Sequence, residues 1–517
     1  MRNKYGVYLV AALAACMLSS AYWMLYSVSA YNTFHEYTAL DYYAYSMYYD
    51  VNYPSVMSGL QLFVFGKHIA PDQLFVLVVY YLWRSPLALL FIQDIALSFT
   101  GLIVFVAASD LLGSPRLGML FELLFLLNPG MHGILGLDYH AEMLIVPFYI
   151  LTFYYYARGM HKHFFASLTL LLGTIEAATA LVAATAVAFA IYSHYNLKGK
   201  DRAEKMHLAK MMVVFALAAL LVYNLIYYYL AASYASYSAV PQFLRLEPWP
   251  GVPIYGTPIA YSGVSLGGGI STLLGEIASG NLGALAQTYL NFTVVYGLLV
   301  AVLGFGIGAL YELPYLVVMA APWFVEVFLL GFTYFASTGR HYFSFAIGGA
   351  FVAAIWGTAR LLRMNAGKTR GRLRLRPGAA RPLIYSSAIT IMAVLFLISL
   401  FLYAPEINWS AIQGYTFSPT PAQQHAYAQL ESVMNLVPQG AQLMTQDNVM
   451  VHMMDRPYIE LPWEPSFQPQ YILFDLDSNL SVPYYSNETQ AFYSYINANG
   501  YQLYAQNGSA VLYRLPN

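Results

Sequence analysis

Long apolar segments recur along most of the chain and are separated by short polar or basic stretches. The first segment, residues 7–30, would be about 36 Å long as a helix, which exceeds the roughly 30 Å hydrocarbon core of a bilayer. It is also longer than the core of a signal peptide, so an uncleaved span is expected. The same pattern predicts eleven spans, near residues 7–30, 86–108, 117–131, 141–157, 164–176, 177–195, 209–232, 290–311, 313–331, 343–360 and 383–404.

Basic residues are concentrated in a few of the connecting loops. Residues 360–381 contain eight Lys and Arg and no acid, and residues 198–210 contain five basic residues and two acids. Short loops with an excess of Lys and Arg remain in the cytoplasm. Because residues 158–163 are basic as well, the apolar segment that follows them is expected to form two helices that turn near residues 173–176. Eleven spans then place the N-terminus in the cytoplasm and the C-terminal segment outside.

The composition indicates an all-α polytopic protein of the plasma membrane. Of 517 residues, 59% are apolar and 9% are charged, with a mean hydropathy of +0.53, whereas soluble domains carry about 25% charged residues.

A net charge of -1 provides no field that would attract nucleic acid, so no such partner is expected. The single cysteine, Cys16, excludes an intrachain disulfide. Several Asn-x-Ser/Thr sequons and 48 Tyr residues favour an archaeal cell.

The chain is expected to contain two domains. Residues 1–404 form the transmembrane domain, whose long outer loops are residues 31–85 and 235–289. The first loop contains apolar stretches at residues 55–66 and 73–83 that are too short to span and suit interfacial or re-entrant helices.

The second expected domain, residues 405–517, is acidic and lies outside the membrane. It contains nine acids and only two basic residues. Its alternating pattern predicts a small α/β domain. The expected elements are helices near residues 420–436 and 487–499 and strands near residues 441–445, 470–475, 501–504 and 510–515.

Ionisable residues gather at the predicted outer face of the membrane. Such groups cost of order 2.5–3.5 kcal/mol at the centre of a membrane helix, so their positions are informative. Carboxylates, imidazoles and a guanidinium at one face supply the groups for acid–base chemistry on an anionic, lipid-linked substrate. The residues are Asp41, His68, Asp72, Asp138, His140, Glu142, Glu176, Arg340 and His341.

The densest group is Asp138, His140 and Glu142 within five consecutive residues. Two carboxylates and an imidazole could bind a divalent metal such as Mg²⁺ or Mn²⁺. A hydrogen-bonded helix start explains the same residues equally well. The sequence leaves both interpretations open.

Several of these stretches resemble a family of membrane proteins known as domain of unknown function 2079 (DUF2079). The resemblance covers about residues 10–360. Two departures stand out, since Ala141 replaces a proline of the family, and Ile175 and Ala177 flank Glu176 where the family usually has Lys and Asp. The stretches that carry the resemblance are Tyr37–Asp41, Gly66–Pro71, Asp138–Glu142, Glu176 and Arg340–Tyr342.

The family in turn resembles multi-span glycosyltransferases of the GT-C type, which use lipid-phosphate-linked sugars. This resemblance implies transfer of a sugar from a polyprenyl-phosphate donor to an envelope glycoprotein or glycolipid acceptor. It implies that Asp41, in the first outer loop, is the catalytic base. Substrate-binding roles are expected for His68, Glu176, Arg340 and His341, with Arg340 and His341 stabilising the phosphate leaving group.

Two other functions remain open. A transporter or flippase for a lipid-linked or small polar substrate would need polar groups at the membrane midplane and often shows paired repeats. Because the ionisable residues are expected at the outer face, an enzyme is favoured over a transporter. The third alternative is a non-catalytic envelope assembly protein whose outer domain binds the partner.

Overall fold

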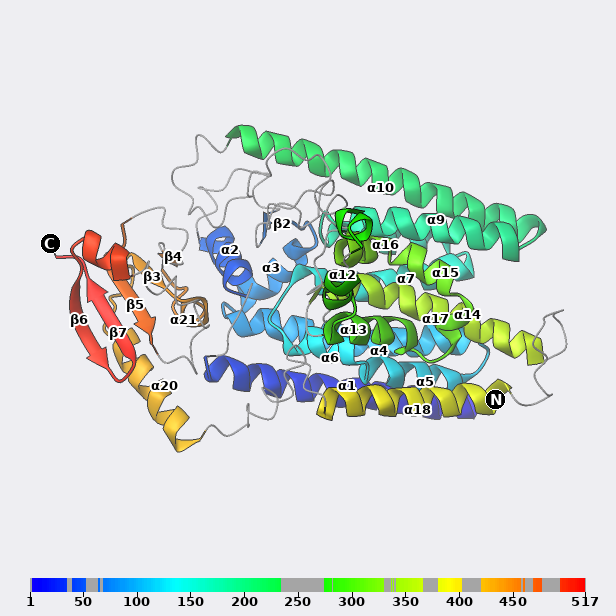
Figure 1. Cartoon of the computed structure of the whole chain (residues 1–517), viewed down its shortest axis with the longest axis horizontal. Coiled ribbons are helices and arrows are strands. Elements are labelled where there is room, and N and C mark those ends of the chain that lie inside the picture. Colours follow the sequence, from blue (N-terminus) through cyan, green and yellow to red (C-terminus); the bar gives the residue numbers. More distant parts are fainter. Residues whose placement is uncertain are drawn as a thin grey trace.

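The computed structural model is an elongated molecule in which a helical bundle carries a small sheet at one end (Figure 1). Most bundle helices run along the long axis, and the N-terminus lies at the end away from the sheet (Figure 1). The structure describes residues 2–34, 40–52, 64–65, 68–233, 274–280, 282–329, 336, 338, 341–365, 380–401, 420–456, 459–460, 468–476 and 493–516.

The first half of the bundle begins its helices at polar caps. Ser85, Ser114 and Asn128 each accept a backbone N–H bond at the start of a helix, and a proline follows each of them. Proline suits this position because its missing N–H would have no partner in the helix. The helices are α1 (Arg2–Asn32), α4 (Pro86–Leu111), α5 (Pro115–Leu126), α6 (Pro129–Gly136), α7 (Ile145–Arg158), α8 (His161–Gly173), α9 (Ala178–Asn196) and α10 (Gly199–Ser233).

The second half of the bundle is more broken. Glu312 and Ala320 each end one short helix and begin the next, with a proline inside the first turn. The elements are α12 (Leu282–Tyr289), α13 (Phe292–Leu303), α14 (Gly308–Tyr311), α15 (Leu313–Met319), α16 (Ala321–Phe324), the π-helical η6 (Val325–Leu329), the 3-10 helix η8 (His341–Phe343), α17 (Ser344–Asn365) and α18 (Ala380–Phe401).

The expectation of eleven spans is not confirmed. Within the described residues, six helices are long and apolar enough to cross a membrane, or seven if the bent pair α5 and α6 forms one span. These seven coincide with seven of the expected segments. The other four fall on short helices, because proline and glycine interrupt the apolar sequence. The predicted turn near residues 173–176 is confirmed, since α8 ends at Gly173 and α9 begins at Ala178.

The segment between α1 and α4, which the sequence predicts as the first outer loop, supplies four elements. They are α2 (Leu40–Asn52), β1 (Val64–Phe65), β2 (His68–Ile69) and α3 (Gln73–Leu82). The helix expected at residues 73–83 is confirmed as α3. The helix expected at 55–66 is wrong at its end, where β1 pairs with β2 in an antiparallel hairpin, and residues 53–63 lie outside the described part. Helix α2 is buried around most of its circumference.

The C-terminal part is the small α/β domain that the sequence predicts. Helix α20 (Pro421–Met434) begins with a capping box formed by Thr420 and Gln423. Five strands form one sheet in the order β4-β3-β5-β7-β6. Both pairings of β3 are parallel, and both pairings of β7 are antiparallel. The remaining elements are β3 (Leu443–Thr445), α21 (Asp447–Met450), β4 (Ile459–Glu460), β5 (Tyr471–Asp475), β6 (Gln502–Asn507) and β7 (Ala510–Arg514).

The C-terminal domain contacts the bundle through α2 and the end of α1. The hydroxyl of Tyr45 donates to the carbonyl of Arg456 at 3.3 Å and accepts from the N–H of Ile459 at 3.2 Å. The ring of His452 packs against Tyr31 and Phe34, with centroids 4.2 and 4.3 Å apart. These contacts fix the sheet against the helix that carries Asp41.

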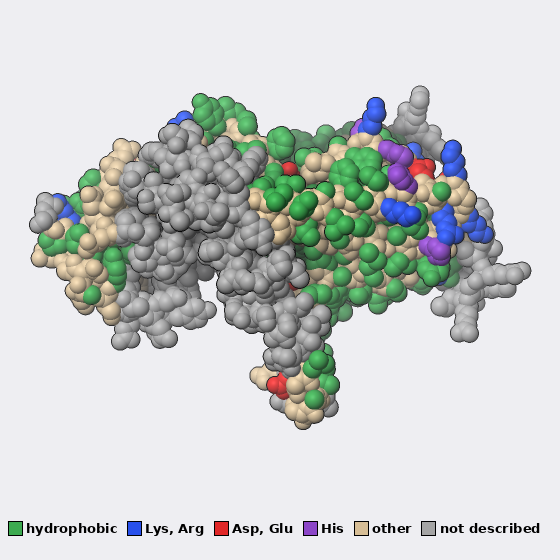
Figure 2. Space-filling view, turned by 90° about the horizontal axis from the view of Figure 1, so that it is seen from above, with side chains coloured by type: hydrophobic (Ala, Val, Ile, Leu, Met, Phe, Trp, Pro, Cys, Tyr) green, Lys and Arg blue, Asp and Glu red, His purple; other side chains and the backbone are tan. Residues whose placement is uncertain are grey.

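Basic side chains lie at the opposite end of the molecule. Residues 158–163 and 198–210 occupy the α7–α8 and α9–α10 junctions. Figure 2 shows Lys, Arg and His side chains gathered at the end of the bundle away from the sheet, beyond a wide hydrophobic surface.

Candidate functional site

Asp138 connects helix α2 to the loop between α6 and α7. One carboxylate oxygen accepts the backbone N–H of Leu40, the first residue of α2, at 3.0 Å. The other lies 3.1 Å from Nδ1 of His140. A carboxylate at a helix N-terminus satisfies a backbone donor and complements the helix dipole. Asp138 thus holds both α2, with Asp41 in its first turn, and the His140 ring.

Two imidazoles stack beside this carboxylate. The rings of His140 and His341 lie 3.6 Å apart at an angle of 20°, and Nε2 of His341 is 3.8 Å from Glu142. Burial lowers the pKa of His140, but Asp138 and Glu142 together raise it more, so its pKa is above the ordinary value. Two stacked imidazolium ions would repel each other. The two carboxylates thus favour protonation of His140, and the stacking disfavours protonation of both rings at once.

Glu176 forms a second pairing at the break between α8 and α9. Its Oε1 lies 2.7 Å from Nδ1 of His68, and its Oε2 accepts the N–H of Ile69 at 3.2 Å. The backbone N–H of Asp72 donates to the carbonyl of Gly173 at 3.0 Å. A side chain at Gly173 would collide with the Asp72 carboxylate. These contacts fasten the β1–β2 hairpin and the start of α3 to the α8–α9 turn.

Buried tyrosines join the two pairings. Burial raises the pKa of Tyr43 well above its ordinary value, and the charges of Glu142 and, more weakly, Glu176 add to the increase. The ring of Tyr43 meets that of Tyr139 edge to face at 5.3 Å. The hydroxyl of Tyr139 donates to Gln73 at the start of α3. Tyr43 therefore lies between the acids of both pairings.

We call the assembled group the outer cluster, after the membrane face at which the sequence analysis expects these residues. It comes from five separate stretches of the chain. All but one of the sequence-predicted site residues belong to it, since Arg340 lies outside the described residues. Asp41 is fully buried on α2, next to the Leu40 N–H that Asp138 holds. The outer cluster comprises Asp41, His68, Asp72, Asp138, His140, Glu142, Glu176 and His341.

The structure gives no support to a metal at Asp138, His140 and Glu142. Among the described residues, no group of three or more His, Cys, Asp and Glu side chains is arranged to hold a metal ion. Asp138 is engaged by His140 and the Leu40 N–H, whereas Glu142 approaches His341. The helix-start interpretation agrees with the Leu40 bond, although the helix that Asp138 holds is α2, not the one that follows it in sequence.

Burial changes the acidity of Asp72. Its carboxyl is 6% exposed, and burial raises its pKa to about 7. A carboxyl that titrates near neutral pH is suited to general acid–base catalysis. The sequence marked Asp72 as polar but gave it no role, because nothing in its neighbourhood of the chain reveals how completely it is buried.

The sequence interpretation missed several buried acids, three of which follow. Asp94 on α4 accepts a hydrogen bond from Ser27 of α1 at 2.8 Å. Glu122 on α5 accepts one from Cys16 of α1 at 3.3 Å. Glu326 in η6 is 8% exposed. The signal in the sequence was a single acid inside an apolar segment. Buried ionisable groups therefore also lie within apolar helices, and not only among the residues that the sequence analysis selected.

The comparisons identify a family for the chain. A family model described as "Predicted membrane protein (DUF2079)" matches residues 42–508, and the chain belongs to that family. No curated protein sequence matches it significantly.

Proposed function

From this membership in the DUF2079 family of membrane proteins and from the outer cluster, we propose that the protein is a membrane glycosyltransferase. It transfers a sugar from a polyprenyl-phosphate donor to an acceptor at the outer face of the membrane. The proposal rests mainly on the outer cluster, which combines carboxylates that can accept a proton with imidazoles that can bear positive charge.

Helix α3 gives the lipid part of the donor a place beside the cluster. Its first residue, Gln73, is buried against Tyr139. Its other face exposes apolar side chains, with Phe75 68%, Val78 61% and Leu82 79% exposed. An amphipathic helix of this kind lies with its apolar face in lipid. A polyprenyl chain along α3 would bring its phosphate to the outer cluster.

In the proposed reaction, the acceptor hydroxyl attacks the anomeric carbon and the bond from that carbon to the phosphate oxygen breaks. Asp41 takes the proton of the hydroxyl, and the polyprenyl phosphate leaves with the bonding electrons. The stacked His140 and His341 imidazoles stabilise the phosphate when one of them is protonated. Arg340, two residues after the described Thr338, is proposed to contribute to the same contact. His68 and Glu176 position the donor.

The proposed topology has a cytoplasmic N-terminus and an outer C-terminal domain. The basic α7–α8 and α9–α10 junctions support it, because they lie at the end of the bundle away from the sheet (Figure 2). In a Cys16→Ser background, Gln506→Cys should react with an impermeant thiol reagent on intact cells, and Lys200→Cys should react only after lysis. Labelling of Lys200→Cys on intact cells would invert the topology.

The test of transfer measures release of polyprenyl phosphate from a labelled polyprenyl-phosphate hexose by protein in nanodiscs, with an envelope extract as acceptor. Asp41→Asn should slow release by about 10²-fold or more, as expected for loss of a general base. Donor binding should persist, because the amide keeps the shape of the acid. Asp50→Asn is the matched control, since Asp50 is also buried on α2 but lies about 180° around the helix.

A transporter for the same lipid-linked sugar is the second candidate, and the acids inside the spans favour it. Asp94 and Glu122 are fully buried in membrane-spanning helices, where ionisable residues often mark transport pathways. Full release activity in Asp41→Asn would remove the proposed base. Movement of the donor across the bilayer of a proteoliposome without any release would replace the transferase by the transporter.

A further inference from the structure

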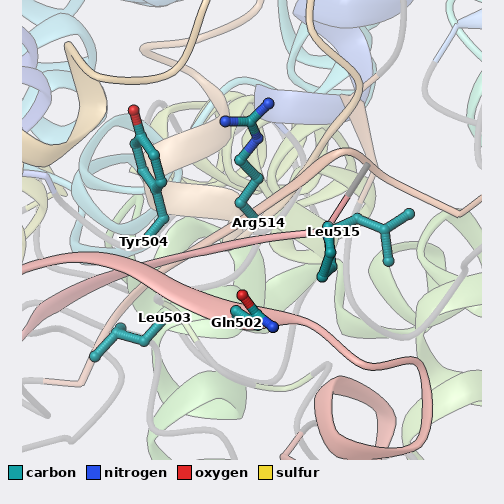
Figure 3. A pocket seen from close by; sticks show the side chains of 6 residues that line it. Gln502, Leu503, Tyr504, Arg514 and Leu515 are labelled. Carbon is teal, nitrogen blue, oxygen red and sulfur yellow. The ribbon is translucent and has the colours of Figure 1, made fainter.

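A pocket lies on the exposed side of the C-terminal sheet, far from the outer cluster. It has a volume of about 230 Å³ and is lined by residues from β6, β7 and the segment after β7. Figure 3 shows the side chains of Tyr504 and Arg514 standing side by side at this place. The volume is below the roughly 300–1,000 Å³ of pockets for drug-sized ligands, so it suits one ring-sized group.

Arg514 is the more accessible of the two basic residues of the domain. Residues 405–517 contain two basic residues, Arg456 and Arg514. Arg456 is buried and donates to the carbonyls of Met453 and Pro438. Arg514 is half-buried, and in the described part of the chain it forms no ion pair. Among the described residues, no carboxylate neutralises the positive charge of its guanidinium.

Two tyrosine rings hold this guanidinium in place. Its central carbon lies 5.8 Å from the ring centroid of Tyr471 and 5.7 Å from that of Tyr504. The two rings are 6.1 Å apart, close to perpendicular at 78°. Because the rings are close to perpendicular, the guanidinium plane can be parallel to only one of them. Ring contacts use none of the five N–H donors of a guanidinium, which can therefore still bind a planar anion.

A strand irregularity lies beside the pocket. The pairing of β6 with β7 shifts between Leu503 and Ala505, so Tyr504 is the extra residue of a β-bulge. Tyr504 points to the side of Arg514, whereas Leu503 points the other way (Figure 3). Tyr504 is 50% exposed, so part of its ring is open to a ligand.

We propose that this pocket binds a sugar that bears a single carboxylate. The carboxylate pairs with the N–H edge of Arg514, the sugar ring packs on Tyr504, and the Gln502 amide lies within the same pocket for a ring hydroxyl. The domain contains nine acids and two basic residues, and this negative field disfavours a polyanion. The inference stands on the pocket and holds whether or not the protein is a transferase.

The test compares three probes by saturation-transfer NMR with the full-length protein in detergent. They are methyl glucuronide, its carboxyl methyl ester and methyl glucoside. The acid should bind about tenfold or more tightly than either neutral probe, because a charge-assisted bidentate pair is worth more than one ordinary hydrogen bond. Equal binding of the acid and its ester by the unmodified protein would overturn the proposal. Tighter binding of inorganic phosphate than of the acid, measured by competition, would overturn it as well.

Variants assign the contact to individual side chains. Arg514→Gln should remove the preference for the acid, and Arg514→Lys should retain only part of it, because ammonium lacks the planar fork. Tyr504→Phe should keep binding and Tyr504→Ala should lose it. Gln506→Ala, on the exposed part of the same strand, is the control for strand integrity. An Arg514→Gln protein that still prefers the acid would contradict the proposal.

Discussion

Buried carboxylates occupy two regions of this protein, and their surroundings differ. In the outer cluster, Asp138, Glu142 and Glu176 each lie next to an imidazole. Inside the bundle, Asp94 and Glu122 each meet one neutral donor, a serine hydroxyl or a cysteine thiol. Each also has a second oxygen without a hydrogen-bond partner in the described structure.

The difference decides what each region can do. A carboxylate beside an imidazole can remain ionised when buried, because the imidazolium offsets its charge. An ionised carboxylate in a membrane span with only a neutral donor is costly, so Asp94 and Glu122 are expected to be neutral acids. The outer cluster is thus a charged site, and the bundle pairs are neutral hydrogen bonds between helices.

The largest effect is expected at Asp138. Asp138→Ala removes the acceptor of the Leu40 N–H and leaves His140 without its nearest counter-charge. The free energy of unfolding should fall by about 3 kcal/mol, which is typical for breaking a buried pair. Thermal unfolding in detergent measures this. If Asp138→Ala lowers the free energy of unfolding by less than Asp94→Ala does, the outer cluster is not the more strongly coupled region.

A pH-dependent effect is expected at Asp72. Burial raises its pKa from 3.8 to about 7 in the folded protein. The neutral carboxyl therefore contributes to the free energy of unfolding fully below pH 3.8, and this contribution is lost as the pH rises through about 7. Asp72→Asn should stabilise the protein at pH 8 and have little effect at pH 4. Unfolding curves at both pH values check this, and a stabilisation that is equal at both would contradict it.

A smaller effect is expected where the sheet meets α2. Tyr45→Phe removes a hydroxyl that donates to Arg456 and accepts from Ile459. The loss should be about 1–2 kcal/mol, because two buried backbone groups lose their partner. Tyr195→Phe, at a ring that is 76% exposed, is the control. If the two variants unfold alike, the contact does not contribute to holding α2.

The smallest effect is expected for Asp94→Asn. An amide can still accept the hydrogen bond of Ser27, and a neutral acid loses no charge when it is replaced. The free energy of unfolding should change by less than about 0.5 kcal/mol. Wild-type Asp94 should also react with a hydrophobic carbodiimide, which attacks protonated carboxyls. A loss as large as that of Asp138→Ala, without carbodiimide labelling, would show that Asp94 is ionised.

The sequence by itself determined the class and the main elements. Apolar runs predicted the long helices, and alternation predicted most of the C-terminal sheet, since both signals are local. It also identified most members of the outer cluster as polar residues near span ends. The eleven spans that it predicted are not confirmed. Hydropathy over a window does not register where proline and glycine divide an apolar segment.

Only the tertiary structure decided which residues meet. Glu176 and His68 are 108 residues apart in sequence, yet their side chains pair at 2.7 Å. The acidity of Asp72 and the pairing of Asp94 with Ser27 depend in the same way on packing between distant segments. Contacts of this kind depend on how whole helices pack, which the local pattern of a sequence does not specify. The identity of polar residues was therefore readable from the chain, whereas their partners and charges were not.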